Sequence, residues 1–277
     1  MLQIASLNSG SNGNCYYIGN ATDAVLVDAG LSCRETEKRM ERLGFSMHRI
    51  KAIFISHEHS DHIKGIQTLS AKYRLPVYIT EATCKSGKLL IDPALKRCFV
   101  AEKPEFIGEL SITGFQKFHD AADPHSFIIK YDSIIVGVFT DIGTPCKNLV
   151  TYFKQCHAAF LESNYDEEML QNGGYPYHLK KRITGGEGHL SNKHAYQLYI
   201  RHRPSFMSHL ILSHLSQHNN CPELVNNLFS SPVTNTRIIV ASRHHESEIF
   251  SIYGSAFKKM IFKTTRPVQM KLFEEFF

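Results

Sequence analysis

The sequence lacks the cysteine spacing that would mark a cysteine zinc site or a disulfide framework. Its seven cysteines are odd in number and widely scattered, and no two of them are spaced as Cys-x-x-Cys. Both kinds of framework use close, repeated cysteine spacings. Both are therefore excluded, and a protein of a reducing compartment, the cytoplasm, is predicted.

Long apolar runs are also missing. No stretch reaches the roughly 18 apolar residues that a membrane-spanning helix requires, and the opening MLQIASLNSGSNGNC is not a charged start followed by an apolar segment. The sequence therefore predicts no secretory signal and no membrane span.

Blocks of like charge, low-complexity linkers and short internal repeats are absent too. The 31 basic and 26 acidic residues leave a formal charge of +5, a mild excess that favours an anionic partner. Without a linker or a composition shift, one domain over residues 1–277 is predicted, with a short tail from about residue 264.

Short apolar strands alternate with helical segments along most of the chain. The first thirty residues favour strands, and a capping box of Ser32 and Glu35 then predicts a helix that ends at Gly44. Further helices are predicted near 63–73, 147–156, after His189 and 222–229, between the strands KAIFIS, PVYIT, LSITGF, SFIIKYDSIIVGVF, AAFLES, HLILS and RIIVAS. Two β-rich halves that each carry helices predict an α/β sandwich.

The stretch SHEHSDHIKG follows the apolar run AIFI directly. In an extended segment side chains alternate, so His57 and His59 are expected to point one way, and Asp61 and His62 toward a second point. So many imidazole and carboxylate groups at a strand end would be costly to desolvate without a cation. The loop is therefore predicted to contribute ligands to two metal ions.

Four ligands cannot complete two metal sites, so further ligands are expected at other strand ends. His119 ends a strand, Asp141 ends SIIVGVFT and His214 ends HLILS, and each is followed by turn-like residues. These three residues are predicted to reach the same place.

In this order, Asp28, the HxHxDH loop, His119, Asp141 and His214 resemble the five motifs of the metallo-β-lactamase superfamily, whose fold is a four-layer αβ/βα sandwich. The resemblance implies one metal held by His57, His59 and His119, a second held by Asp61, His62 and His214, and Asp141 as the bridge. It also implies that Asp28 orients the loop, although an Asp before Gly can be a simple turn former. Zinc or manganese is expected at these sites, with iron as a further alternative.

A pair of divalent cations about 3.5–4 Å apart can hold a shared water as hydroxide near neutral pH, so hydrolysis is the expected chemistry. The segment GHLSN resembles the His-x-Ser/Thr motif of the nucleic-acid phosphodiesterase branch, which makes His189 the candidate general acid. Glu162 is the acid that this branch places behind the site, and Asp61 is counted in the catalytic set as well as among the ligands. The alternative for His189 is that it only caps its helix or bonds Glu162.

The segments SGSNGNCYYI, VDAGLS, HDAADP, FTDIG and the long block ESNYDEEMLQNGGYPYHLKKRITGGEGHLSN resemble the YycJ/WalJ-like branch. That resemblance implies 5′-to-3′ exonuclease action on double-stranded DNA and a role in DNA repair. The spacings leave no room for the exosite arm of tRNA-maturing relatives or for a β-CASP insertion. A small-molecule metallohydrolase acting on a thioester, lactone or cyclic phosphodiester remains the alternative, and a metal-bound scaffold is a third.

Four further segments suggest partners. Gln269, Leu272 and Phe273 of QMKLF resemble the pentapeptide by which replication and repair enzymes dock on the sliding clamp, although this tail could equally pack on its own domain or a second subunit. Basic and aromatic residues alternate at 175–182 and 196–203, which suits nucleic-acid contact or a merely solvated surface. The turn SGSNGN could present backbone N–H groups to a phosphate.

Overall fold

The computed structural model describes residues 1–230 and 234–254, which form two mixed β-sheets of seven strands each. The first sheet has the order β14-β1-β2-β3-β4-β5-β6. Its strands are β1 (Leu2–Asn8), β2 (Cys15–Gly19), β3 (Ala24–Val27), β4 (Ile50–Phe54), β5 (Val77–Tyr78), β6 (Lys96–Arg97) and β14 (Phe250–Ile252).

The second sheet has the order β13-β12-β11-β10-β9-β8-β7. Strands β10 to β13 run parallel to one another, so their carboxyl ends lie at one edge of the sheet. The strands are β7 (Pro104–Ile107), β8 (Leu110–Gln116), β9 (His125–Tyr131), β10 (Ile134–Phe139), β11 (Ala158–Glu162), β12 (His209–Ser213) and β13 (Arg237–Val240).

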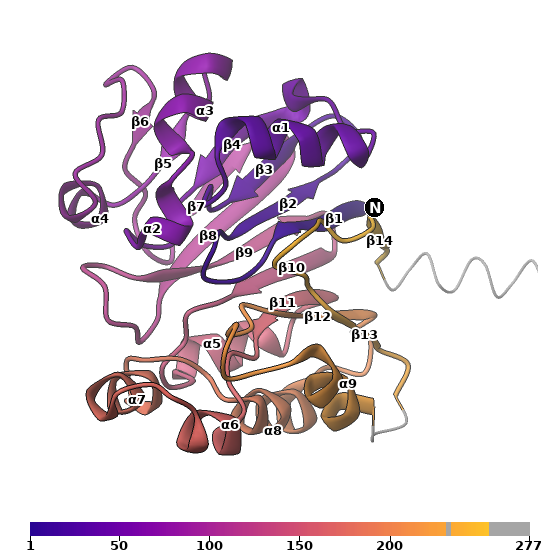
Figure 1. Cartoon of the computed structure of the whole chain (residues 1–277). Helices are drawn as coiled ribbons and strands as arrows, with labels where there is room; N and C mark the ends of the chain where they lie inside the picture. The colour runs from indigo at the N-terminus through magenta and orange to yellow at the C-terminus, as the bar shows by residue number, and fades with distance from the viewer. Residues whose placement is uncertain (231–233, 255–277) are drawn as a thin grey trace, which may run out of the picture.

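Helices cover the outer face of each sheet, which gives four layers and confirms the predicted α/β sandwich (Figure 1). The first sheet carries α1 (Cys33–Arg42), the 3₁₀ helix η1 (Met47–Arg49), α2 (Ser60–Ile63), α3 (Ile66–Tyr73) and α4 (Glu81–Ser86). The second carries α5 (Lys147–Phe153), α6 (Glu167–Asn172), α7 (Tyr177–Thr184), α8 (Asn192–His202) and α9 (Pro222–Ser230).

The core between the sheets is built from the alternate, inward-facing residues of the strands. Tyr16 of β2 packs on Phe160 of β11 with ring centroids 4.8 Å apart, and Phe54 of β4 meets Phe127 of β9 at 5.7 Å. All four rings are almost fully buried, and burial of one such side chain contributes about 1.5–3 kcal/mol. This contact joins strands that are far apart in the sequence and sets the two sheets face to face.

The helix predicted near 63–73 is in fact two helices, α2 and α3, separated by Gly65. A Cβ at Gly65 would lie 2.0 Å from the carbonyl oxygen of Leu31. Only glycine therefore fits at this position, where the loop packs against the segment after β3. The strand predicted at PVYIT is reduced to Val77–Tyr78, and the helix predicted at 147–156 ends at Phe153. Local pattern located these elements but did not fix where they end.

No helix in residues 1–230 and 234–254 is long and apolar enough to cross a membrane. The prediction of one domain over residues 1–277 stays a prediction. The tail from about residue 264, with Gln269, Leu272 and Phe273, lies outside the described residues.

Candidate metal centre

The predicted site residues come together at the carboxyl ends of the central strands. Asp28 directly follows β3, and the segment that begins with Ser56 follows β4, which runs parallel to β3. Asp141 follows β10 and His214 follows β12, in the parallel part of the second sheet. Since parallel strands end at the same edge, each pair of loops converges, and the face-to-face packing of the sheets brings the two pairs together.

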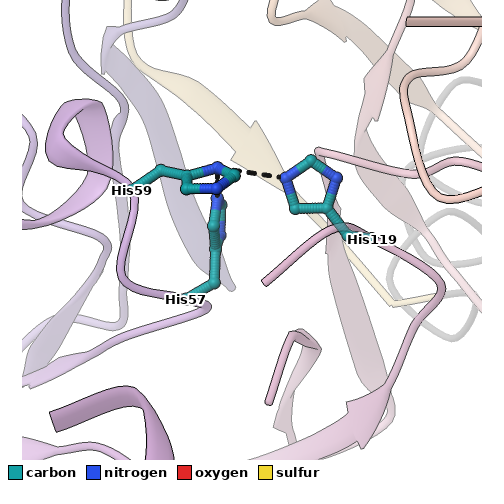
Figure 2. A group of neighbouring side chains, drawn as sticks. All are labelled: His57, His59 and His119. Carbon is teal, nitrogen blue, oxygen red and sulfur yellow. Dashed lines mark hydrogen bonds between the residues drawn. The ribbon is translucent and has the colours of Figure 1, made fainter. Parts of the chain in front are cut away.

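Three imidazoles form the first cluster. His57 and His59 come from one loop and His119 from the loop after β8, and Figure 2 shows the three rings turned toward one another. The Nδ1 atom of His59 lies 3.1 Å from His57 Nε2 and 3.2 Å from His119 Nε2. Burial lowers the pKa of all three rings, that of His119 to about 4, so they are neutral at pH 7 and present lone pairs to a shared point.

The second cluster combines a carboxylate with two imidazoles. Asp61 Oδ2 lies 3.5 Å from His62 Nε2 and 3.4 Å from His214 Nε2. Burial alone would lower the pKa of His62, but the surrounding carboxylates, Asp141 first among them, raise it well above its usual value. Burial is also the largest single influence at His214 and lowers its pKa, but Asp141, Asp61 and Glu162 together outweigh it and raise the pKa to about 10. The carboxylates of this cluster therefore stabilise positive charge, such as a proton on an imidazole or a bound cation.

Asp141 lies between the two clusters. Its Oδ2 atom is 3.2 Å from His62 Nε2, and its Oδ1 atom is 3.8 Å from His119 Nε2. Although His62 is near, Oδ2 is buried without a hydrogen bond of good geometry. An unsatisfied buried carboxylate oxygen is costly, and it fits a position that a cation would occupy. The donor set, imidazole with carboxylate, suits zinc, manganese or iron.

Each of four clustered histidines has one ring nitrogen fixed by the protein, which leaves the other to face the cluster. In each case the fixed nitrogen is Nδ1. It contacts Ser56 Oγ at 2.9 Å in His57, Asp28 Oδ2 at 2.7 Å in His62, the Gly188 carbonyl at 3.1 Å in His119, and Glu162 Oε1 at 3.0 Å in His214. Partners of this kind fix the tautomer and orientation of a metal-binding histidine.

Asp28 holds the start of the metal loop. Its fully buried carboxylate accepts hydrogen bonds from the Ser56 backbone N–H and the Ser56 hydroxyl, both at 2.8 Å, as well as from His62. The backbone φ of Asp28 is +61°, so the residue also makes a turn, as the alternative interpretation of Asp28 as a turn former predicted. It is therefore a turn former whose side chain contacts the loop.

His189 lies outside these two clusters, but with Asp141, Glu162 and His214 it forms a further group whose ligand atoms are within 4.8 Å of one another. Its Nδ1 group donates to Glu162 Oε1 at 2.8 Å and is 3.8 Å from Asp141 Oδ1, and its side chain is 17% exposed. Hydrogen bonds from the Ile142 and Leu190 backbone N–H groups hold the other oxygen of Glu162. His189 itself makes no capping bond to α8, whose N-cap is Ser191, so the capping alternative is wrong and the bond to Glu162 is present.

Several residues of the site were missed from the sequence. Asn14 Nδ2 lies 3.1 Å from Asp61 Oδ2 and 3.0 Å from His62 Nε2, and Asn164 donates to the His214 carbonyl at 2.8 Å. Lys117 is buried under the site and donates to the Thr140 carbonyl at 2.7 Å. The turn-like neighbourhoods of Asn14 and Asn164 carried no sign of this role.

Comparisons with known proteins agree with the geometry of the site. Residues 9–120 match the sequence profile of the metallo-beta-lactamase superfamily. The chain is 35% identical over 226 residues to exodeoxyribonuclease YycJ of Bacillus anthracis, which covers 80% of this chain and 86% of the relative. It is 33% identical over 223 residues to exodeoxyribonuclease WalJ of Streptococcus pneumoniae D39, covering 79% and 83%. Among solved structures, the metallo-beta-lactamase fold protein YhfI of Bacillus subtilis superposes with a TM-score of 0.69 at 17% identity, over 90% of this chain and all of that one.

The chain therefore belongs to the metallo-β-lactamase superfamily, a class of metal-dependent hydrolases, and has its four-layer fold. Within that superfamily it lies in the YycJ/WalJ-like branch, as the resemblance indicated.

Proposed function

We propose that the protein is a metal-dependent DNA exonuclease that degrades double-stranded DNA from the 5′ end. The observation that carries the proposal is the set of adjoining side-chain groups that could hold metal ions, with the His189–Glu162 pair at one side, in a chain that is 33–35% identical to relatives named exodeoxyribonuclease. The mild excess of basic residues is consistent with an anionic polymer as substrate.

In this proposal two divalent cations are held as the sequence motifs implied. His57, His59 and His119 would hold one and Asp61, His62 and His214 the other, with Asp141 available to both. When bound, the cations would activate water and neutralise charge on the phosphoryl oxygens. The four protein-held ring nitrogens keep the ligands in place without rearrangement, and Asp28 keeps the loop of the first two histidines against β3.

His189 is proposed to donate a proton to the departing 3′ oxygen. Because Glu162 accepts the hydrogen bond from its Nδ1 group, the ring is held in one orientation, and its Nε2 atom is the one left for the substrate. Glu162 also accepts from His214, so the same carboxylate fixes the acid and a proposed metal ligand in one frame. Burial raises and His189 lowers the pKa of Glu162, and the outcome is a pKa of about 2, which keeps the carboxylate ionised at neutral pH.

A cavity of about 560 Å³, lined mainly by residues between Tyr165 and Thr184, is proposed to receive nucleic acid. Tyr165, Tyr175, Tyr177 and the side chains of Lys180 and Lys181 are among its lining residues. Tyr177 is 80% exposed, which leaves its ring face open to a base, while the lysines suit backbone phosphates. Of the two segments with alternating aromatic and basic residues, 175–182 thus contributes to a cavity lining, whereas 196–203 does not contribute to this one.

The test is a digestion of labelled substrates by purified protein loaded with Mn²⁺ or Zn²⁺. Duplex and single-stranded DNA, each labelled at either the 5′ or the 3′ end, distinguish the polarity and the preferred strand type, and RNA of the same sequence tests the sugar preference. We expect stepwise loss from the 5′ end of duplex DNA and no digestion by Asp141→Asn. Intact DNA together with turnover of thioesters, lactones or cyclic phosphodiesters would show a small-molecule hydrolase instead.

The tail and the compartment belong to the same proposal. Docking on a sliding clamp through Gln269, Leu272 and Phe273 is consistent with a DNA-repair enzyme of the cytoplasm. A clamp pull-down that is unchanged when Gln269 and Phe273 become alanine would remove the docking proposal and leave the exonuclease proposal intact.

A further inference from the structure

A second cavity, of about 410 Å³, adjoins the metal centre at His214, because Leu215 of its lining follows that residue. It lies between the segment after β12 and the segment after β13, and its lining includes Ser9, Leu215, Gln217 and Arg243. Its volume is within the range of ligand sites, ~300–1,000 Å³. Ser9 ties the cavity to the centre, because its hydroxyl accepts a hydrogen bond from the His214 backbone N–H at 2.7 Å.

The charge in this cavity is of one sign. Arg243 and the neighbouring His244 and His245 line it, and none of the lining residues is acidic. The nearby carboxylates of Glu246 and Glu248 are engaged elsewhere, with Arg42 and Arg237 respectively. Anions would therefore be attracted to the cavity and cations would not.

The guanidinium of Arg243 makes few hydrogen bonds within the described residues. Within the described residues no carboxylate forms an ion pair with it, its Nη1 atom is buried without a hydrogen-bond partner, and Nη2 donates only a long 3.4 Å bond to Ser11. Burial lowers its pKa and Tyr175 offsets this only in part, so holding the charge here costs free energy. A guanidinium is well suited to binding phosphate through hydrogen bonds, and Arg243 lines the cavity with hydrogen-bonding capacity that the described residues leave largely unused.

The turn that carries Ser11 is shaped around this arginine. Gly10 has φ +146°, and a Cβ there would lie 3.2 Å from Arg243 Cβ. Asn12 donates to the Arg243 carbonyl at 2.8 Å, and Asn14, four residues after Gly10, reaches Asp61 in the metal centre. The glycine-rich turn thus connects the arginine to a proposed metal ligand by a short path.

We infer that Arg243 is a specificity residue. It binds a phosphate of the DNA strand being cut, and this phosphate is a different one from the scissile phosphate. A strand whose scissile phosphate lies at the metal centre would bring a neighbouring or terminal phosphate over this cavity. The inference rests on the proposed exonuclease function and adds a binding residue that is not among the metal ligands or the proposed acid.

The experiment compares Arg243→Gln with Arg243→Lys and with a matched control, Arg74→Gln, an exposed arginine paired with Asp92 at the end of α3. Binding is measured by fluorescence anisotropy of metal-loaded protein with phosphorothioate DNA duplexes, carrying either a 5′-phosphate or a 5′-hydroxyl, from 50 to 200 mM salt. Turnover of bis(p-nitrophenyl) phosphate, which has no second phosphate, reports on the metal centre alone.

We expect Arg243→Gln to weaken DNA binding about three- to tenfold and to reduce the slope of log K against log salt by about one, because one phosphate contact is lost. Arg243→Lys should keep the slope, and turnover of the small phosphodiester should not change. A loss confined to 5′-phosphorylated DNA identifies a terminal phosphate, and an equal loss with both identifies an internal one.

Binding by Arg243→Gln that matches Arg74→Gln would overturn the inference while the exonuclease proposal stands. A parallel loss of small-phosphodiester turnover would also overturn it, since the arginine would then act through the metal centre. Wild-type protein that neither binds nor cuts DNA would remove the proposed function itself, and the inference with it.

Discussion

Three site residues have left-handed backbone conformations that most residues avoid. The φ angles are +61° at Asp28, +54° at Asp141 and +58° at His214. Asp tolerates this region better than most side chains, whereas it is uncommon for His, and such strain persists only where surrounding contacts hold it. Asp28 and His214 follow a strand directly and Asp141 follows one after a single residue, so each sharp turn lies at a strand end.

Asp28→Asn tests how far the loop depends on that residue. Asparagine keeps the shape and tolerates the left-handed backbone, but it offers one oxygen where Ser56 and His62 now share two. We expect a 10- to 100-fold loss of metal affinity, the usual range for such a partner, measured by competition with a chromophoric chelator. Asp132→Asn, at the exposed left-handed tip of the β9–β10 hairpin, is the control and should bind metal as wild type does. Equal affinities in the two variants would contradict the role.

His189→Gln tests proton donation. If His189 protonates the departing oxygen, the variant should retain its metal and lose about 10²–10⁴-fold in kcat on DNA. It should lose far less on bis(p-nitrophenyl) phosphate, because nitrophenolate departs without a proton. His178→Gln, on the exposed face of α7, is the matched control. Equal losses on both substrates, or unaltered DNA cleavage, would exclude the assignment.

At the scale of elements, backbone hydrogen bonds hold the metal loop to the segment after β3 and to the residue before β2. The His62 carbonyl accepts from Ala29 N–H at 2.9 Å, and the Asp61 carbonyl accepts from Asn14 N–H at 2.7 Å. A Cβ at Gly30 would lie 1.7 Å from that Asp61 oxygen. Only glycine permits two backbones to approach this closely, so Gly30 sets the distance between the loop and the sheet.

Gly30→Ala should therefore force the loop away from β3. Overpacking of this kind costs about 1–3 kcal/mol or more in the free energy of unfolding, and we expect metal affinity to fall with it. Denaturant unfolding and metal titration measure the two effects. Gly174→Ala is the control, because nothing lies within 4 Å of a Cβ there, and it should change stability by less than about 0.5 kcal/mol. A Gly30→Ala variant as stable as Gly174→Ala would show that the loop can shift freely.

The strands, the sandwich and the clustered residues could be predicted because their signals are local. His57, His59 and Asp61 stand within five positions of one another, and the strands before them are apolar runs. By contrast, α6 and α7 were not predicted. They have only six and eight residues, which is too short to show a clear helical period of apolar residues. Asn14 and Arg243 could not be predicted as site residues, since only the packing of distant loops gives them their neighbours.

At the scale of the whole molecule, the centre lies where the two sheets meet, and it concentrates negative charge there. Asp28, Asp61, Asp141 and Glu162 are all largely buried and close to one another. Without a cation their charge is balanced by protons on histidine, which is why the pKa of His214 is about 10. Cation and proton therefore compete for the same site, and metal binding should release protons.

Removing the metal should for this reason make stability depend on pH. The folded-state pKa of His214 is above its unfolded value, so the stabilisation from its proton is complete below pH 6.5 and is lost as the pH rises toward about 10. His62, whose pKa is also raised, acts in the same direction. We expect the melting temperature of chelator-treated protein to fall between pH 6.5 and 9.5, and that of reloaded protein to fall much less, because the cation replaces the protons. Scanning calorimetry at both ends of this range measures the difference, which His178→Gln should leave unchanged. Parallel pH profiles with and without metal would mean that the cation does not take the place of these protons between the sheets.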